Sequence, residues 1–183
     1  AWTWEHLALT RARTIAGDHD LQDEIMGFRA RLLLEKSGND DVLVDVADMR
    51  RRIAAAKTPL SENDVKLGAG RLQDITLYAQ MIALRCGAPA ADLEGQLQAG
   101  VADGSLDAGD KAALLAAAGL FEAMQTAVRF LTEDGVDLTD LGEGARRLVL
   151  RETKTVSLPE LEQAMQNHAA IADEIISRGV SQE

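Results

Sequence analysis

The chain has 183 residues, and 19 lysine and arginine residues against 30 aspartate and glutamate residues give it a formal net charge of −11 at pH 7. So acidic a chain repels nucleic-acid phosphates and anionic lipid, and we therefore expect neither nucleic acid nor a membrane as its partner. A hydrophobic content of 46% excludes a disordered chain, and the length suits one domain, residues 1–183, with a sizeable core.

The composition favours helices over strands. Alanine and leucine, both strong helix formers, account for 30 and 25 residues. Valine and isoleucine, which are typical of sheets, account for only 10 and 8. We therefore predict an all-α fold.

Helical periodicity recurs along the chain and is interrupted at short intervals by Gly, Pro, Asn and Asp. The predicted helices cover approximately residues 2–16, 21–36, 40–58, 71–86, 92–101, 106–133, 141–150 and 158–175. Short connections between amphipathic helices are typical of an antiparallel helical bundle, here of six to eight helices.

Two predicted helices carry clear apolar stripes. The sixth has a bundle seam of Leu114, Ala117, Phe121, Met124, Val128 and Leu131. The last begins with a capping pair, Ser157 and Glu160, and has a stripe of Leu161, Met165, His168, Ala172 and Ile175. We interpret both stripes as core and not as the lining of a cofactor pocket.

Common signatures of catalysis and of membrane insertion are missing from the sequence. No phosphate-binding G-x-x-x-x-G-K-[ST] loop and no H-E-x-x-H metal motif occurs. The longest apolar run, residues 112–121, has only half the length of a membrane-spanning helix. The chain has a single cysteine, Cys86, which suits a core position in a protein of the reducing cytoplasm. Asp18, His19 and Asp20 lie at a helix boundary, where they fit a helix cap better than a metal site. Together with the missing motifs, this leads us to expect no catalytic or metal-binding residue in the chain.

The segment Trp2–Arg13 is the first candidate site. On one helix, Trp4 and Leu7 would share a side with Arg11, and Trp2 would share another with Arg13. One interpretation is a central helix whose arginines reach past apolar neighbours to solvent. The other is a helix that docks a neighbouring domain and offers Arg11 and Arg13 to an anion.

The segment Lys66–Ile75 is the second candidate site. Lys66 and Arg71 flank two glycines, Gly68 and Gly70, just where a helix begins. Helix N-termini present unpaired N–H groups and glycine permits close approach, so Lys66 and Arg71 could meet a phosphate or a carboxylate, with Asp74 as an orienting partner. A tight turn with solvated cations is the alternative.

At these two segments the chain resembles a known family, the glutamine synthetase adenylyltransferases. Their helical domain opens with W-T-W-E-H-x-A-L-x-R-A-R and a Gly-Asp turn, matched here by residues 2–13 and 17–18. Met49–Ile53 matches M-R-x-R-I, and residues 66–80 match K-x-x-x-G-G-[LI]-x-D-I-E-F-x-x-Q. The last match departs from the family pattern at Arg71, Thr76 and Leu77, which puts a shared acidic role at position 76 in doubt.

The resemblance implies a helical domain that follows a nucleotidyltransferase domain in a longer bifunctional enzyme. Such enzymes transfer an adenylyl group from ATP to a tyrosine of glutamine synthetase, under control by glutamine and the PII protein. The chemistry resides in a G-S-x-x-D-x-D set that holds Mg²⁺, and this chain lacks that set. The implied partners are therefore the preceding catalytic domain, glutamine synthetase and PII, and Mg²⁺ and ATP belong to the parent enzyme.

Three alternatives remain open at this point. The chain could be the helical domain of a PII uridylyltransferase, a self-standing helical interaction protein, or an enzyme complete in these residues. Because the chain begins at Ala1 and not at Met, we expect a fragment of a longer protein.

Overall fold

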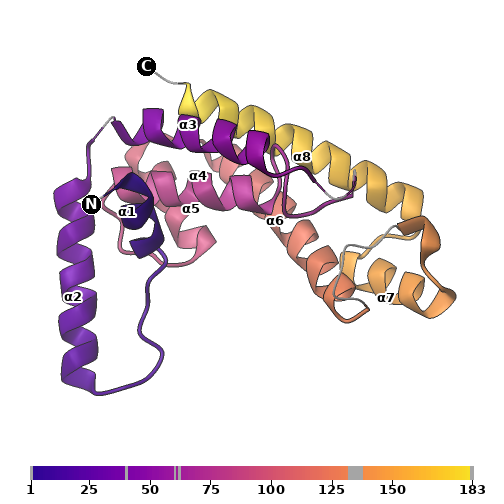
Figure 1. Cartoon of the computed structure of the whole chain (residues 1–183), viewed down its shortest axis with the longest axis horizontal. Coiled ribbons are helices and arrows are strands. Elements are labelled where there is room, and N and C mark those ends of the chain that lie inside the picture. The colour runs from indigo at the N-terminus through magenta and orange to yellow at the C-terminus, as the bar shows by residue number, and fades with distance from the viewer. Residues whose placement is uncertain (1, 40, 60, 62, 132–137, 182–183) are drawn as a thin grey trace. The chain divides into compact units, whose positions relative to one another are not determined.

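The computed structural model describes residues 2–39, 41–59, 61, 63–131 and 138–181. Within these ranges the backbone forms helices and no strand, so the predicted all-α helical fold is confirmed (Figure 1). The helices are α1 (Thr3–Leu9), α2 (His19–Lys36), α3 (Asp41–Ala56), α4 (Leu72–Arg85), α5 (Leu93–Asp103), α6 (Ala108–Arg129), the 3-10 turn η1 (Leu138–Asp140), α7 (Glu143–Thr153) and α8 (Leu158–Val180).

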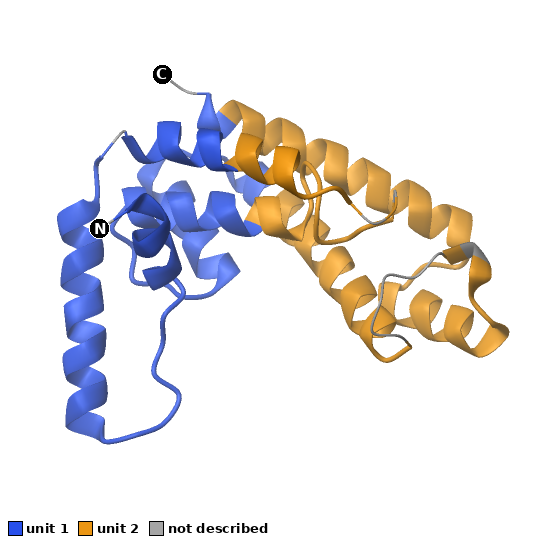
Figure 2. Ribbon diagram, viewed as in Figure 1, with its two compact units in different colours: residues 1–49, 76–111, 179–183 blue, residues 50–75, 112–178 orange. Residues whose placement is uncertain are grey.

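The chain divides into two compact units (Figure 2). Unit 1 comprises residues 1–49, 76–111 and 179–183, and unit 2 comprises residues 50–75 and 112–178. Helices α3, α4, α6 and α8 contribute residues to both units. That residues 1–183 behave as one domain stays a prediction.

A buried arginine organises unit 1. Arg29 of α2 is 2% exposed, and its guanidinium donates to four backbone carbonyls: Leu9 at 2.8 Å, Thr10 at 2.5 Å, Pro89 at 2.6 Å and Ala90 at 3.4 Å. Burial lowers the pKa of Arg29 from its ordinary value. The guanidinium thereby ties α2 to the end of α1 and to the segment that precedes α5.

The same contacts end the first helix early, and the predicted helix over residues 2–16 is wrong in its second half. In a longer helix the carbonyls of Leu9 and Thr10 would accept hydrogen bonds from backbone N–H groups four residues further on. Here Arg29 donates to both carbonyls, the Leu9 carbonyl accepts from the N–H of Ala12 at 3.1 Å in a turn, and the Gln96 side chain donates to the Thr10 carbonyl at 3.2 Å. The helix therefore stops at Leu9.

Helix α2 begins at a well-formed cap, as the sequence indicates. The Asp18 side chain accepts a hydrogen bond from the N–H of Leu21 at 3.1 Å, so the cap interpretation of Asp18 is confirmed. Of the eighteen residues of α2, only Arg29 and Leu33 are buried.

Unit 2 has its core on α6 and α8. Leu114, Ala117, Phe121 and Met124 are buried, which confirms most of the predicted seam. Helix α6 ends at Arg129, so Leu131 lies beyond it and is exposed, and the predicted helix end at Glu133 falls outside the described residues.

The predicted cap and stripe of the last helix are largely confirmed. The Ser157 hydroxyl accepts from the N–H of Glu160 at 3.3 Å, and the Glu160 carboxylate accepts from the N–H of Val156. The buried stripe residues on α8 are Leu161, Met165, Ala172 and Ile175. His168 is half-buried. Over the described ranges, no helix combines the length and the hydropathy that crossing a bilayer requires.

Candidate functional site

The five candidate residues fall in different units. Arg11 and Arg13 belong to unit 1, and Lys66, Arg71 and Asp74 belong to unit 2. Because α1 ends at Leu9, Arg11 and Arg13 lie in the following turn and extended segment, where both are exposed. The predicted helix faces that pair them with the tryptophans do not form.

A turn anchored by Asp64 precedes α4. One carboxylate oxygen of Asp64 accepts from the N–H groups of Lys66 at 2.8 Å and Leu67 at 2.9 Å. The N–H of Leu72 then donates to the carbonyl of Val65 at 3.1 Å, which closes the loop where α4 begins. The Lys66 side chain is exposed.

Asp74 is buried in the first turn of α4 and is held by a bidentate ion pair. Nε of Arg50 donates to Oδ1 of Asp74 at 2.6 Å, and Nη2 of Arg50 donates to Oδ2 at 2.7 Å. The N–H of Gly70 donates to the same Oδ2 at 2.9 Å. Asp74 therefore joins α3 to the loop before α4, and its carboxylate faces Arg50 and the loop backbone. Its role as an orienting partner of Lys66 and Arg71 in anion contact stays a prediction.

The ion pair extends to α8. Nη2 of Arg50 also donates to Oδ1 of Asp173 at 2.9 Å, and the Ser177 hydroxyl donates to the same oxygen at 3.1 Å. Asp74 and Asp173 together raise the pKa of Arg50 despite its burial. We call Arg50, Asp74, Asp173 and Ser177 the Arg50 network.

Gly70 lets the loop approach α8 closely. Its φ is +66°, in the left-handed region that glycine adopts without strain. A Cβ at this position would lie 2.0 Å from the carbonyl oxygen of Ala169 and 2.7 Å from the nitrogen of Asp173. No side chain fits there, so the second candidate segment requires a glycine at position 70.

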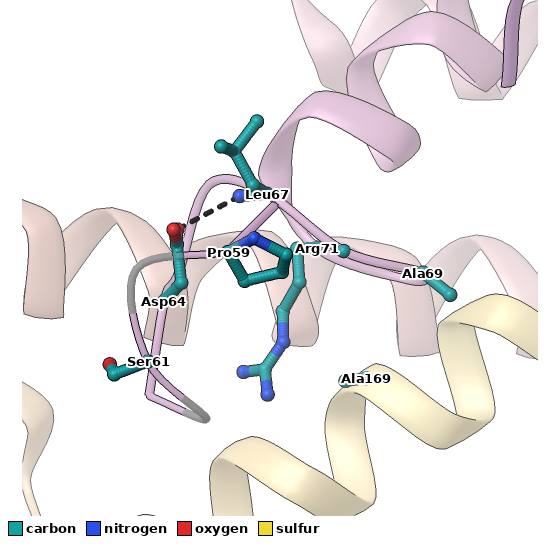
Figure 3. Close-up of a pocket in the computed structure, with 8 residues that line it drawn as sticks. Pro59, Ser61, Asp64, Leu67, Ala69, Arg71 and Ala169 are labelled. Carbon is teal, nitrogen blue, oxygen red and sulfur yellow. Dashed lines mark hydrogen bonds between the residues drawn. The ribbon is translucent and has the colours of Figure 1, made fainter. Parts of the chain in front are cut away.

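A hollow of about 510 Å³ lies beside this loop. Its walls come from the loop and from α8, through Pro59, Ser61, Asp64, Leu67, Gly68, Ala69, Arg71 and Ala169. Figure 3 shows the Arg71 side chain extending from the loop towards the helix that carries Ala169. Arg71 is the only cationic residue among these described lining residues, and they do not include Lys66.

Arg71 is itself only 9% exposed. Its guanidinium carbon lies over the Phe121 ring, 5.1 Å from the ring centroid, which is a cation–π contact. Burial lowers the pKa of Arg71, and the Asp64 carboxylate acts in the opposite direction. The lining of the hollow thus includes one cation in contact with an aromatic ring and one carboxylate that accepts from backbone N–H groups.

Among the residues that the structure describes, no three side chains of the His, Cys, Asp and Glu types gather as a metal site. That Mg²⁺ and ATP belong to the parent enzyme stays a prediction.

Comparison with known proteins decides the family. No protein-family model matches the chain. It is 35% identical over 168 residues to the bifunctional glutamine synthetase adenylyltransferase/adenylyl-removing enzyme of Rhizobium meliloti (strain 1021), over 88% of the chain and 17% of the relative. The enzyme of the same name from Rhodopseudomonas palustris (strain BisB5) is 30% identical over 183 residues, which is 97% of the chain and 18% of the relative. The chain is homologous to one region of the glutamine synthetase adenylyltransferases.

The chain thus spans less than a fifth of the length of these relatives, and the match confirms the resemblance carried by the motifs. Nothing in the matches favours a PII uridylyltransferase. The adenylyltransferase resemblance also shows what sequence reasoning missed. Arg50 lies in the matched M-R-x-R-I motif and Asp74 in the matched K-x-x-x-G-G motif, and the structure joins the two motifs by an ion pair.

The predicted site did not include Arg50. Three arginines follow one another at positions 50–52, and the sequence does not indicate which of them forms an ion pair with Asp74. The departure at Arg71 fits the loop: the φ of Arg71 lies outside the left-handed region that favours glycine, and its guanidinium carbon lies over the Phe121 ring of α6.

Proposed function

We propose that this chain is the helical region that follows the nucleotidyltransferase domain in a glutamine synthetase adenylyltransferase. The parent enzyme would transfer AMP from ATP to a tyrosine of glutamine synthetase, and this region would dock the catalytic domain without supplying reactive groups. The observation that carries the proposal is the match of 88% to 97% of the chain to enzymes of that name.

An incompletely covered helix supports the docking role. Leu21, Ile25 and Phe28 recur at the spacing of one helix face on α2, and they are 54%, 47% and 56% exposed. Figure 2 shows α2 projecting beyond the other helices of unit 1. An isolated helix of this length is marginally stable in water, and burial of its exposed apolar face against another protein surface would stabilise it.

The opening segment of unit 1 carries further exposed aromatic side chains. Trp2 and Trp4 are 74% and 56% exposed, although Leu7 of the same helix is buried. Tryptophan is enriched where proteins bind one another. We define the docking surface as Trp2, Trp4, Leu21, Ile25 and Phe28.

The partner we assign to the docking surface is the catalytic domain of the same polypeptide, because the relatives are more than five times as long as the matched region. Exposed Asp20, Asp23 and Glu24 lie on α2 near the surface, so the facing part of that domain should carry apolar side chains with basic residues around them. Glutamine synthetase and PII would be the further protein partners. Mg²⁺ and ATP would bind the catalytic domain, and the enzyme would work in the cytoplasm.

The test uses the full-length enzyme with Phe28→Asp. We expect adenylylation of glutamine synthetase to fall by about tenfold or more, because a buried unpaired carboxylate would weaken the domain contact. The matched control is Leu34→Asp, since Leu34 is 67% exposed on the opposite side of α2. Equal rates for the wild type and Phe28→Asp would contradict the docking role, and absence of adenylylation by the wild-type enzyme would contradict the function itself.

A further inference from the structure

We propose that a second hollow in unit 2 binds a small amphiphilic carboxylate, a molecule with an apolar body and one carboxylate end. This hollow has a volume of about 440 Å³, and its walls come from α6, the end of α7 and α8. We call it the His168 hollow, after a residue of its lining. It shares no lining residue with the hollow beside Arg71, and it does not rest on the proposed function.

The walls of the His168 hollow are mostly apolar. Helix α6 contributes Leu115, Leu120 and Ala123, and α8 contributes Ala164. All four residues are half-buried, so each keeps apolar surface that the described part of the chain leaves uncovered. A hollow of this size, lined by apolar side chains with a few polar groups, is typical of small-molecule sites. An alkyl group placed against these walls would be removed from water, which favours binding.

Two polar side chains of the lining define the other end of the ligand. The His168 imidazole is half-buried and the Lys154 side chain is exposed, and neither forms a hydrogen bond or ion pair with any residue that the structure describes. Glu152, the one carboxylate among these lining residues, already accepts from Nε and Nη2 of Arg151 at 2.9 Å and 2.7 Å. The charge without a partner is therefore positive, and it matches a ligand with a single carboxylate.

Lys154 occupies a backbone position that glycine would fill with less strain. Its φ of +56° and ψ of +33° lie in the left-handed region, and it is the only non-glycine residue with a positive φ in the described part of the chain. Because a Cβ in this conformation approaches the following carbonyl, lysine costs free energy here that glycine avoids. The backbone thus favours glycine at position 154, and we assign the lysine to contact with the ligand.

Gly119 shows the converse choice on the opposite wall. It lies inside α6, where alanine or leucine would stabilise the helix, and its φ is not in the left-handed region. A Cβ added at Gly119 would meet nothing within 4 Å, so no neighbour excludes a larger residue. Glycine at this position leaves room in the hollow. Two lining residues are therefore the less stable choice locally, which is typical of positions where function and stability conflict.

The experiment is an NMR titration of the ¹⁵N-labelled 183-residue chain with sodium hexanoate at constant ionic strength. Two parallel series use acetate, which lacks the longer alkyl chain, and hexanol, which lacks the charge. We expect saturable shifts of the Gly119, Lys154 and His168 amide signals with hexanoate, at a dissociation constant on the order of 1 mM. Acetate should bind about tenfold more weakly or less tightly still, and hexanol about threefold more weakly.

Two variants separate binding from folding. Lys154→Gly should weaken hexanoate binding by about threefold or more and leave hexanol binding unchanged, because only the charge is lost. Gly119→Leu should weaken both by about tenfold or more, because its side chain would occupy the hollow. Neither variant should lower the Tm, since one relieves the left-handed strain and the other removes a glycine from a helix. Lys154→Asn, which also tolerates the left-handed conformation, repeats the first test.

The matched control is Lys57→Gly, which removes the same charge from an exposed position of unit 2 that does not line the hollow. Its affinity for hexanoate should equal that of the wild type. Shifts that do not saturate, or an equal loss of affinity in Lys57→Gly and Lys154→Gly, would overturn the proposal. Unchanged hexanoate affinity in either Lys154→Gly or Gly119→Leu would do the same.

Discussion

Replacing Arg50 by methionine should cost the chain much of its stability. The side chains of Arg50 and Asp74 are only 18% and 10% exposed, and the substitution removes both hydrogen bonds between them. Asp74 would remain buried and would still accept from the Gly70 N–H, and Asp173 would lose its contact with Arg50.

The magnitude follows from the burial of the pair. Breaking a buried ion pair by removing one partner costs about 3–5 kcal/mol. Because Asp173 is 42% exposed and water can replace its contact, we expect the lower end, about 3 kcal/mol. For a chain of this size that corresponds to a fall in Tm of roughly 6–12 °C.

Urea and thermal unfolding followed by circular dichroism would measure the loss. Arg50→Lys retains the charge but not the bidentate geometry, so it should lie between the wild type and Arg50→Met. Arg146→Met, at an exposed position on α7, should change stability by less than about 0.5 kcal/mol.

A double-mutant cycle isolates the pair itself. Arg50→Met combined with Asp74→Asn should show a coupling free energy of about 1 kcal/mol or more, since the two side chains are in direct contact. A loss below about 1 kcal/mol for Arg50→Met, or additive effects in the cycle, would refute the role assigned to the Arg50 network.

Three other predictions concern single residues. Gly70→Ala should destabilise the chain by about 2 kcal/mol or more in urea unfolding, because the new Cβ meets the Ala169 carbonyl and φ is +66°; an unchanged midpoint would contradict the close approach. Arg29→Met should cost about 2–4 kcal/mol because the carbonyls of Leu9, Thr10 and Pro89 lose a charged donor, and it should speed tryptic cleavage after Arg11; equal cleavage rates would argue against the role of these hydrogen bonds. Burial raises the pKa of the Cys86 thiol from its ordinary 9.0, so less thiolate is present at pH 8. Iodoacetamide should therefore react more slowly with the folded chain than with the urea-unfolded chain, and this difference in rate should narrow as the pH rises. Equal rates at pH 8 would contradict the raised pKa.

Local physics explains which features could be predicted from the sequence. Helix content follows from alanine and leucine, and the starts of α2 and α8 follow from caps at Asp18 and Ser157 whose partners lie three residues away. The buried seam of α6 follows from helical spacing alone. The resemblance to the family could also be recognised from the sequence, because the family's motifs are contiguous stretches of residues.

Tertiary structure decided the end of α1 and the surroundings of the candidate residues. The first helix ends at Leu9, where Arg29, twenty residues away, donates to the Leu9 carbonyl. Asp74 faces Arg50 across twenty-four residues, and Arg71 lies over Phe121 of another helix. Spacing along one helix determines which side chains share its face, but a hydrogen bond between distant segments depends on how the core packs them together.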